Sequence, residues 1–290
     1  MFLQGKRILF FSAHLFGYQN DIRLVMESVG AIVDYYDERP ANNFLVKGVI
    51  RINRNLLAGY INHYYNKIIK ETLQKEYDYV FFIKGESISA SNVRRLKQFH
   101  PEANFIIYHW DSIANNSNAQ NLLPYFDRVF SFDKIDCERL GLHFLPLFYT
   151  PDYANIPYYD KEIKYDMLFV GTTHSDRYKL VKRIEEQIIK MGGLCLTWFY
   201  FPSKILYYKM KIQNSYLRQI PVHTFHFKPM SKELLLQLYA GSRIIIDVQH
   251  PKQTGLTMRC IETLGAKRKL ITTNYYITAV SYTHLTLPTN

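Results

Sequence analysis

Residues 241–274 constrain the fold of this chain more than any other segment. Residues 243–248 are a short β-branched run of the kind that forms a buried parallel strand. Polar and turn-forming residues follow, and over 256–264 apolar side chains recur at helical spacing, with Gly265 at the position of a C-cap glycine. Another strand is predicted over 269–273. The segment therefore predicts a strand, a glycine-containing loop, a helix and a strand.

The predicted loop and the start of the helix have the properties of an anion site. A strand that feeds a helix through such a loop leaves unpaired backbone N–H groups at the positive end of the helix, where phosphates bind. Arg259 adds a cation whose planar donors suit a diphosphate. Glu262, three residues further on, can accept hydrogen bonds from ribose hydroxyls. A plain βαβ unit with a surface Arg–Glu pair is the alternative interpretation.

The whole run DVQHPKQTGLTMRCIETLGAKRKLITTN resembles the donor-binding segment of bacterial two-Rossmann-domain (GT-B) glycosyltransferases, in particular the lipopolysaccharide and capsule biosynthesis group. The resemblance implies that Glu262 binds the donor ribose and that Gly255, Leu256 and Thr257 lie against the diphosphate. Retaining relatives often carry another glutamate eight residues before the ribose glutamate, where this chain has Thr254. The sequence consequently does not support retention of the anomeric configuration.

A second strand-to-helix turn, within residues 169–176, is the other predicted contact of a donor diphosphate. Three small or hydroxyl residues there can offer backbone N–H groups, namely Gly171, Thr172 and Thr173. Asp176 is predicted to be the helix N-cap rather than a ligand. His174 either reaches the donor or lies exposed in the loop.

The first half of the chain carries a motif of the same glycosyltransferase group. Its sequence YHWDS, residues 108–112, follows a predicted strand, and the group has a similar YxWDS. As in that group, SFDxxD and PLFY segments come next, with Ser131, Phe132, Asp133, Asp136 and residues 146–149. The resemblance therefore extends over both halves of the chain.

Attack by a sugar hydroxyl needs a carboxylate or an imidazole as general base. Asp111 is the first candidate for this role, and His109 and His14 are the second. The alternative is that Asp111 caps a turn beside a core Trp110, and that His14 is simply a loop residue.

Strands and helices alternate along most of the chain, which predicts mostly parallel, doubly wound sheets. The predicted strands are 6–12, 31–36, 79–83, 104–108, 128–132, 144–148 and 165–170, and the predicted helices are 21–29, 53–75, 89–99 and one that ends before Gly192. The irregular stretch 149–164 predicts a domain boundary. We therefore expect an α/β protein with two Rossmann-like domains, 1–150 and 151–279, that face a cleft to which both contribute.

Composition limits the partners and the compartment. The 290 residues are 48% hydrophobic and carry a net charge of +11, which favours acidic partners such as a nucleotide diphosphate, an anionic lipid surface or nucleic acid. Three cysteines, far apart and without a CxxC, predict buried thiols rather than disulfides or a zinc site. No apolar run is long enough to span a bilayer, and the amino terminus fits a strand better than a signal peptide. We expect a cytoplasmic protein, with possible contact to the inner face of the membrane.

Residues 203–218 interleave lysine and arginine with tyrosine, isoleucine and leucine. Such a stretch suits an anionic membrane, where lipid-linked acceptors reside. It also suits single-stranded nucleic acid, although no RNA-binding signature accompanies it, and nucleic acid is not expected as a partner. The third interpretation is an amphipathic surface helix whose lysines face solvent.

The carboxyl-terminal string VSYTHLTLPT, residues 280–289, reads like the conceptual translation of a sequencing-library adapter. We expect that the native sequence departs from this chain near Ala279 and that the second domain is incomplete. A genuine terminal strand is the alternative.

The sequence as a whole predicts a metal-independent glycosyltransferase that uses a nucleoside-diphosphate sugar as donor substrate, with no other cofactor, and a glycan or lipid-linked acceptor. No DxD pair follows a predicted strand, so we expect Arg259, helix amino termini and Lys252 to stabilise the leaving diphosphate. The rival hypothesis is a non-catalytic nucleotide-sugar-binding or regulatory module.

Overall fold

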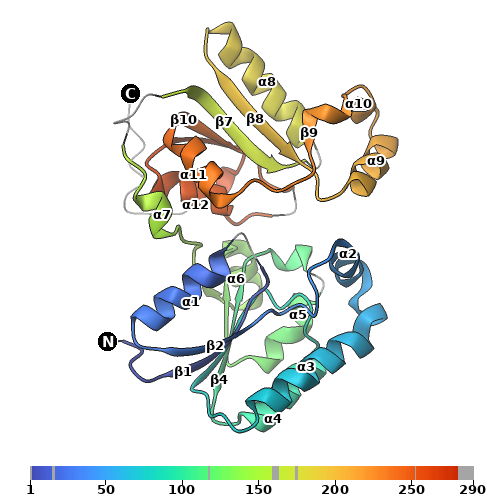
Figure 1. Ribbon diagram of the computed structural model, residues 1–290, viewed down its shortest axis with the longest axis vertical. Helices are drawn as coiled ribbons and strands as arrows, with labels where there is room; N and C mark the ends of the chain where they lie inside the picture. Colours follow the sequence, from blue (N-terminus) through green and yellow to red (C-terminus); the bar gives the residue numbers. More distant parts are fainter. Residues whose placement is uncertain are drawn as a thin grey trace. The chain divides into compact units, whose positions relative to one another are not determined.

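The computed structural model describes residues 2–14, 17–116, 118–158, 163–173, 176–251 and 253–279. The predictions for His174, Lys252 and the tail 280–290 therefore lie outside the described residues. The chain divides into two compact units, Met1–Pro146 (unit 1) and Leu147–Asn290 (unit 2). Each unit is built around one parallel β-sheet with helices packed on it (Figure 1).

Unit 1 has a six-stranded sheet in the order β2-β1-β3-β4-β5-β6. Its strands are β1 (Arg7–Phe11), β2 (Ile32–Tyr36), β3 (Tyr79–Ile83), β4 (Asn104–His109), β5 (Arg128–Ser131) and β6 (His143–Phe144). Its helices are α1 (Tyr18–Ser28), α2 (Phe44–Asn53), α3 (Ala58–Thr72), α4 (Ala90–Phe99), α5 (Ala119–Leu122) and α6 (Lys134–Leu140), with short 3₁₀ turns η1 (Arg54–Leu57), η2 (Ile113–Asn115) and η3 (Leu123–Tyr125).

The core of unit 1 follows from the period of two in its strands. Alternate residues of β1, β3 and β4 point to one face, where α3 and α4 cover them. Parallel register places Phe11 beside Phe82 and Phe82 beside Ile107, and the rings of Phe11 and Phe82 stack with centroids 4.3 Å apart. The strands are apolar on both faces because helices cover both, as is usual for parallel sheets.

Unit 2 has a five-stranded parallel sheet in the order β11-β10-β7-β8-β9. Its strands are β7 (Tyr165–Thr172), β8 (Cys195–Tyr200), β9 (Phe225–His226), β10 (Ser242–Asp247) and β11 (Lys269–Thr272). Its helices are α7 (Pro151–Ala154), α8 (Arg177–Lys190), α9 (Lys204–Gln213), α10 (Ser215–Arg218), α11 (Lys232–Ala240) and α12 (Met258–Gly265), with 3₁₀ turns η4 (Val222–Thr224) and η5 (Tyr275–Ala279). Among the residues described, no helix has both the length and the hydrophobicity that crossing a bilayer requires.

The strand order marks where each sheet can hold a ligand. In unit 1 the chain places β2 on one side of β1 and then β3 on the other, and in unit 2 it places β8 on one side of β7 and later β10 on the other. Ligands of open α/β sheets bind beyond the carboxyl ends of the strands where the order reverses. The ends of β1 and β3, and of β7 and β10, are therefore the places to look for a site.

The structure corrects two predicted elements of unit 1. The helix expected over 53–75 is interrupted, because it begins as η1 and becomes α3 only at Ala58, while α2 precedes it. The strand expected over 144–148 is only the two residues of β6. Here the carbonyls of Leu145 and Pro146 accept hydrogen bonds from the Tyr108 hydroxyl at 3.0 and 2.9 Å instead of continuing the ladder.

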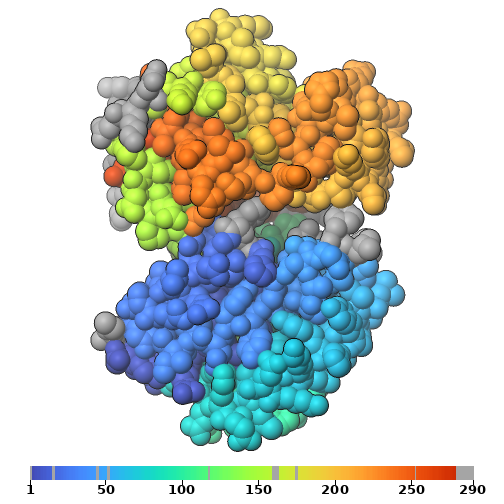
Figure 2. All heavy atoms as spheres, in the orientation of Figure 1, coloured from blue at the N-terminus to red at the C-terminus, as the bar shows by residue number. Residues whose placement is uncertain are grey.

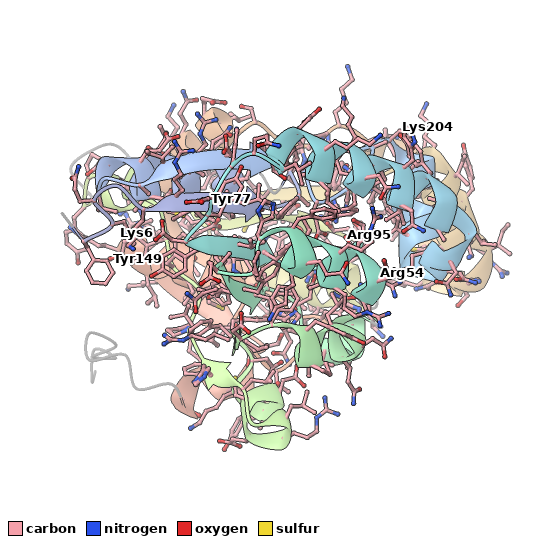
Figure 3. The ribbon with its side chains drawn as sticks, turned by 90° about the horizontal axis from the view of Figure 1, so that it is seen from below. Lys6, Arg54, Tyr77, Arg95, Tyr149 and Lys204 are labelled. Atoms are coloured by element: carbon pink, nitrogen blue, oxygen red, sulfur yellow. The ribbon has the colours of Figure 1, made fainter. Side chains whose placement is uncertain are left out.

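Gly265 is not the C-cap that its position in the sequence predicted. The left-handed residue after α12 is Lys267, with φ of 54°. Gly265 is the last residue of the helix, and a Cβ there would lie 2.5 Å from Cγ of Tyr149, a residue labelled in Figure 3. The absence of a side chain is thus required by close packing of α12 on the segment that opens unit 2.

We expect Gly265→Ala to lower the free energy of unfolding of unit 2 by about 1–3 kcal/mol, because Cγ lies next to the Tyr149 backbone and cannot move away by ring rotation alone. The chain has two tryptophans, and in a Trp110→Phe background Trp198 reports on unit 2. Urea titration followed by fluorescence measures the change. Adding Tyr149→Ala should restore most of the loss, and a double variant no more stable than Gly265→Ala alone would contradict this packing explanation.

Candidate functional site

In unit 2, the carboxyl ends of β7 and β10 bring together segments that are far apart in the sequence. Gly171 and Thr172 end β7, Thr173 follows and is buried, and Asp247 ends β10. Helices α8 and α12 both begin at this edge, after β7 and β10 respectively. The structure therefore places the two loops that the sequence singled out next to each other at the point of strand-order reversal.

Arg259 lies at the centre of this edge. Its guanidinium donates to the Val170 carbonyl, lies 3.4 Å from Asp247 Oδ1 and stacks 5.6 Å from the centroid of the Phe169 ring. The side chain is 21% exposed. Burial acts to lower the pKa of Arg259, but the nearby negative charges, Asp247 first, outweigh it and raise the pKa above its usual value. Arg259 is thus a fixed, permanently charged group with one face still accessible.

Arg177 supplies a second guanidinium at this edge, which is buried and which the sequence interpretation missed. At the first turn of α8 it is 7% exposed, its Nη1 donates to the Thr172 carbonyl at 2.8 Å, and its Nη2 donates to the Val248 carbonyl. Nε is buried without a hydrogen-bond partner in the part of the chain that the structure describes. Burial, followed by repulsion from Arg259, lowers the pKa of Arg177 to about 9. The only sequence signal was a basic residue directly after a strand-to-helix turn.

Gly171 lies where the two guanidinium groups approach each other. A Cβ at this position would be 3.4 Å from Nη2 of Arg259 and 3.5 Å from Nη1 of Arg177. The hydrogen bonds that the Arg177 side chain donates go to the carbonyl oxygens of Thr172 and Val248, and no carboxylate among the described residues accepts from it directly. Two desolvated cations this close repel one another, and a bound anion relieves that repulsion.

Asp247, also missed from the sequence, organises the start of α12. Its carboxylate is fully buried and accepts hydrogen bonds from the hydroxyls of Thr257 and Thr272, each at 2.9 Å, besides facing Arg259. Thr257 is the N-cap of α12 and accepts from the amide of Cys260 at 3.3 Å. Its hydroxyl is therefore committed to the fold, and only the backbone here is available to a ligand.

The other predicted residues of the loop are held by the protein itself. The Gly255 carbonyl accepts from Asn274 Nδ2 at 3.1 Å, and Leu256 is 4% exposed. Glu262 is 8% exposed and forms a hydrogen bond with the hydroxyl of buried Tyr153, whose pKa is raised by burial and by that carboxylate. The roles of these residues toward a donor stay predictions.

Asp176 occupies the predicted N-cap position of α8, but its side chain makes no capping hydrogen bond. The first turn of α8 is tied instead by Arg177 to the ends of β7 and β10. An uncapped helix start leaves backbone donors of this turn without an intrahelical partner.

In unit 1, the carboxyl ends of β1 and β4 carry the three candidate bases, and Lys84 follows the strand β3 between them. Asp111, whose side chain is 38% exposed, forms an ion pair with Lys84 Nζ at 2.5 Å. Lys84 has a left-handed backbone, φ 77°, which is uncommon for a residue with a side chain and costs conformational energy. The protein thus holds an ammonium group against the first-choice candidate base.

The Ser131–Asp136 segment supports the loop that carries Asp111. Asp133 caps α6 and accepts a hydrogen bond from Ser112, while Asp136 accepts from the Ile113 amide at 2.7 Å and pairs with Arg139 at 2.9 Å. These carboxylates are buried, so their role in the structure is to position the YHWDS loop. Trp110 is 8% exposed and packs edge-on against Tyr18 and Tyr108, as the alternative interpretation predicted.

His14 is exposed over 57% of its side chain, with Nε2 3.3 Å from Asp37 and Nδ1 3.2 Å from Gln19 Nε2. His109, in contrast, is 1% exposed and its Nε2 has no hydrogen-bond partner within the described ranges. Burial lowers the pKa of His109 to about 4, with a backbone hydrogen bond to Lys84 acting in the opposite direction. Of the three candidates, Asp111 and His14 are exposed to solvent.

The buried His109 should make unit 1 sensitive to acid. Between pH 6.5 and about 4 the unfolded state binds a proton at this imidazole and the folded state does not, so stability falls as pH falls. One pKa unit is worth about 1.4 kcal/mol, so the His109 contribution to this loss is roughly 3 kcal/mol. Urea titrations of a Trp198→Phe protein across this range should show a steeper pH dependence than the same protein with His109→Asn. Equal slopes would contradict a depressed pKa.

Comparison with known proteins gives the class of the fold. No protein-family model matches the sequence, and a search of curated proteins found no match. Among solved structures, an alpha-glucosyltransferase in complex with UDP and a 13-mer DNA matches with a TM-score of 0.57 at 13% identity, over 92% of this chain and 79% of that one. A glycosyltransferase from Rickettsia africae ESF-5 has a TM-score of 0.49 at 14% identity, over 92% and 79%. The glycotransferase of kitacinnamycin has 0.47 at 8%, over 96% and 88%.

At 13% identity, the match with the alpha-glucosyltransferase shows the fold alone. This fold is the α/β fold with two parallel sheets that GT-B glycosyltransferases have. The fold class predicted from the sequence is thereby confirmed. The cleft between the domains and the roles of the site residues stay predictions. Among the described residues, no cluster of three or more histidine, cysteine or acidic side chains has the arrangement of a metal site.

Proposed function

We propose that this chain is a glycosyltransferase that moves a sugar from a nucleoside-diphosphate donor to an envelope polysaccharide or lipid-linked acceptor without a metal ion. The observation that carries the proposal is the pair of guanidinium groups next to Gly171 at the strand-order reversal of unit 2, of which Arg177 is buried and Arg259 is partly exposed. The similarity of residues 247–274 to the donor-binding segment of the lipopolysaccharide and capsule group supports the same assignment.

The donor diphosphate would bind in unit 2 beside the two guanidinium groups, where a negative charge would relieve their repulsion. Arg259 is held by Asp247 and Phe169, and Arg177 by two carbonyls, so both are oriented before a ligand arrives. As the glycosidic bond to the diphosphate breaks, negative charge grows on the phosphate oxygens, and preorganised cations and helix-start N–H groups stabilise it. Glu262 would accept from the ribose hydroxyls, in place of or beside Tyr153.

The acceptor would be activated by a base in unit 1. Asp111 is accessible and carries a carboxylate that can take the proton of a sugar hydroxyl, while Lys84 orients it. His14 is the second choice, since its Nδ1 forms a hydrogen bond with Gln19 that a bond to the acceptor hydroxyl would have to replace. Burial of His109 makes it the least accessible of the three. The α-glucosyltransferase that shares the fold was solved with UDP, which makes UDP the first nucleotide to test.

Calorimetric titration with uridine and guanosine diphosphates in the presence of EDTA tests the donor site directly. We expect one of the two to bind, and Glu262→Ala to weaken its binding about tenfold or more, because hydrogen bonds to a charged group are the stronger ones. Glu262→Gln keeps an acceptor and should lose less, and Glu233→Ala, an exposed glutamate on α11, serves as the matched control.

Unchanged binding in Glu262→Ala would remove Glu262 from the donor site, and failure of both nucleotides to bind would contradict the proposal. Nucleotide binding without release of sugar from any nucleotide-sugar would favour the non-catalytic module instead.

A further inference from the structure

The segment that connects β8 to β9 contains α9, a helix with two apolar faces. The inner face of α9 packs into the core of unit 2 through Leu206, Tyr207 and Met210. The opposite side carries Ile205, Tyr208 and Ile212, which follow i, i+3, i+7 spacing and are 71%, 54% and 72% exposed. One buried face is enough to fix a surface helix, so the outer apolar residues are not explained by folding.

Cations surround these outer apolar residues. Lys204, Lys209 and Lys211 lie on α9 and Arg218 ends α10, and none of the four forms an ion pair with a carboxylate in the residues for which a structure is given. No aspartate or glutamate occurs between Glu186 and Glu233 in the sequence. We name these four cations with Ile205, Tyr208, Ile212 and Tyr216 the α9–α10 surface. It combines apolar side chains with an uncompensated positive charge.

The α9–α10 surface is preformed. Ser203 caps α9 by accepting from the Leu206 amide at 3.1 Å, and Asn214 caps α10. Arg218 Nε donates to the Lys211 carbonyl at 3.2 Å and its Nη2 donates to the Ile212 carbonyl, which fastens the end of α9 to α10. Figure 1 shows both helices beyond β9, the edge strand of the sheet, and Figure 2 shows them at the surface of unit 2; Figure 3 labels Lys204 at the first turn of α9.

We infer that the α9–α10 surface docks this protein on an anionic lipid bilayer. Exposed isoleucines and tyrosines enter the boundary between headgroups and acyl chains, and flanking lysines and arginine bind the acidic headgroups. Branched aliphatic side chains at the centre of the surface do not stack on bases, which disfavours single-stranded nucleic acid. The concentration of like charge disfavours an interface with a second copy, since interface cores are depleted of charge. The inference does not depend on glycosyl transfer.

Sedimentation of the full chain with lipid vesicles, without nucleotide or sugar, tests this inference. We expect binding to phosphatidylcholine vesicles that contain phosphatidylglycerol, little binding to pure phosphatidylcholine, and loss of binding in high salt. Lys204→Glu/Lys209→Glu and, separately, Ile205→Ser/Ile212→Ser should each weaken binding about tenfold or more. All four residues are exposed, so folding should be unaffected, which urea titration checks.

The matched control is Arg183→Glu/Lys190→Glu, which changes the net charge equally through two exposed cations of α8. It should retain most of the binding. The inference is overturned if wild-type protein does not bind the anionic vesicles, if the control loses as much as the lysine variant, or if the isoleucine variant binds like wild type. Selective binding of single-stranded DNA through the same lysines, with no vesicle binding, would also overturn it and assign the surface to nucleic acid.

Discussion

Replacing Arg259 by alanine is expected to reduce kcat/KM for the nucleotide-sugar donor by about 100- to 1000-fold. The guanidinium is held in place by Asp247, the Val170 carbonyl and the Phe169 ring, so no reorganisation is needed when charge develops on the leaving diphosphate. Removal of one such preorganised donor from an active site commonly costs two to three orders of magnitude in rate. Initial rates of nucleoside diphosphate release measure the effect.

Two further variants separate phosphate binding from folding. Arg259→Lys keeps the charge but loses the planar pair of donors, so it should be intermediate. Arg243→Ala removes an arginine of the same unit whose side chain is 60% exposed, and it should retain nearly full activity. If Arg259→Ala stays folded, as judged by the urea midpoint of Trp198 fluorescence, and transfers sugar at the wild-type rate, the donor site proposed for unit 2 is wrong.

Asp247→Ala should lower the free energy of unfolding of unit 2 by about 3–5 kcal/mol, the range measured when one partner of a buried ion pair is removed. The carboxylate is fully buried, and its loss removes the negative charge that faces the Arg259 guanidinium and the acceptor of the hydroxyls of Thr257 and Thr272. Since Trp110 and Trp198 lie in different units, urea titration of a Trp110→Phe protein isolates the effect on unit 2.

Asp247→Asn provides the comparison, because it keeps an acceptor oxygen for a threonine hydroxyl while it removes the charge. We expect it to lie between wild type and alanine. A loss below about 1 kcal/mol in Asp247→Ala, the value typical of an exposed pair, would mean that this carboxylate does not organise the start of α12.

The elements with strong local sequence signals were the most predictable part of the fold. Strand β11 begins at the predicted Lys269, strand β3 has its predicted bounds, and α8 ends before Gly192, because β-branched runs and helix-ending glycines are local signals. Gly265 was misassigned since its reason for being glycine is the Tyr149 ring, which lies more than a hundred residues earlier in the sequence. No local pattern carries that contact.

The sequence predicted where in the fold the candidate site lies, but it did not predict all of the residues that form it. Arg259 and Gly171 were singled out because they follow strands, and all strand ends of a parallel sheet meet at one edge. Arg177 and Asp247 were missed, since a single arginine or aspartate gains its role only when β7 and β10 become neighbours. Likewise, His109 looked like a candidate base in the sequence, and only the fold buries it and lowers its pKa.

The sequence by itself determined the alternation of strands and helices, two parallel-sheet units, and the cationic, acid-free stretch that became α9 and α10. Periodicity, turn residues and charge are local properties, so they can be recognised in the sequence without a structure. Only the tertiary structure decided that two arginines lie next to Gly171 and that Asp247, which faces one of them, is fully buried. It also decided that α9 has a second apolar face toward solvent. Burial and proximity depend on which strands and helices are neighbours in space, and sequence separation carries no information about that.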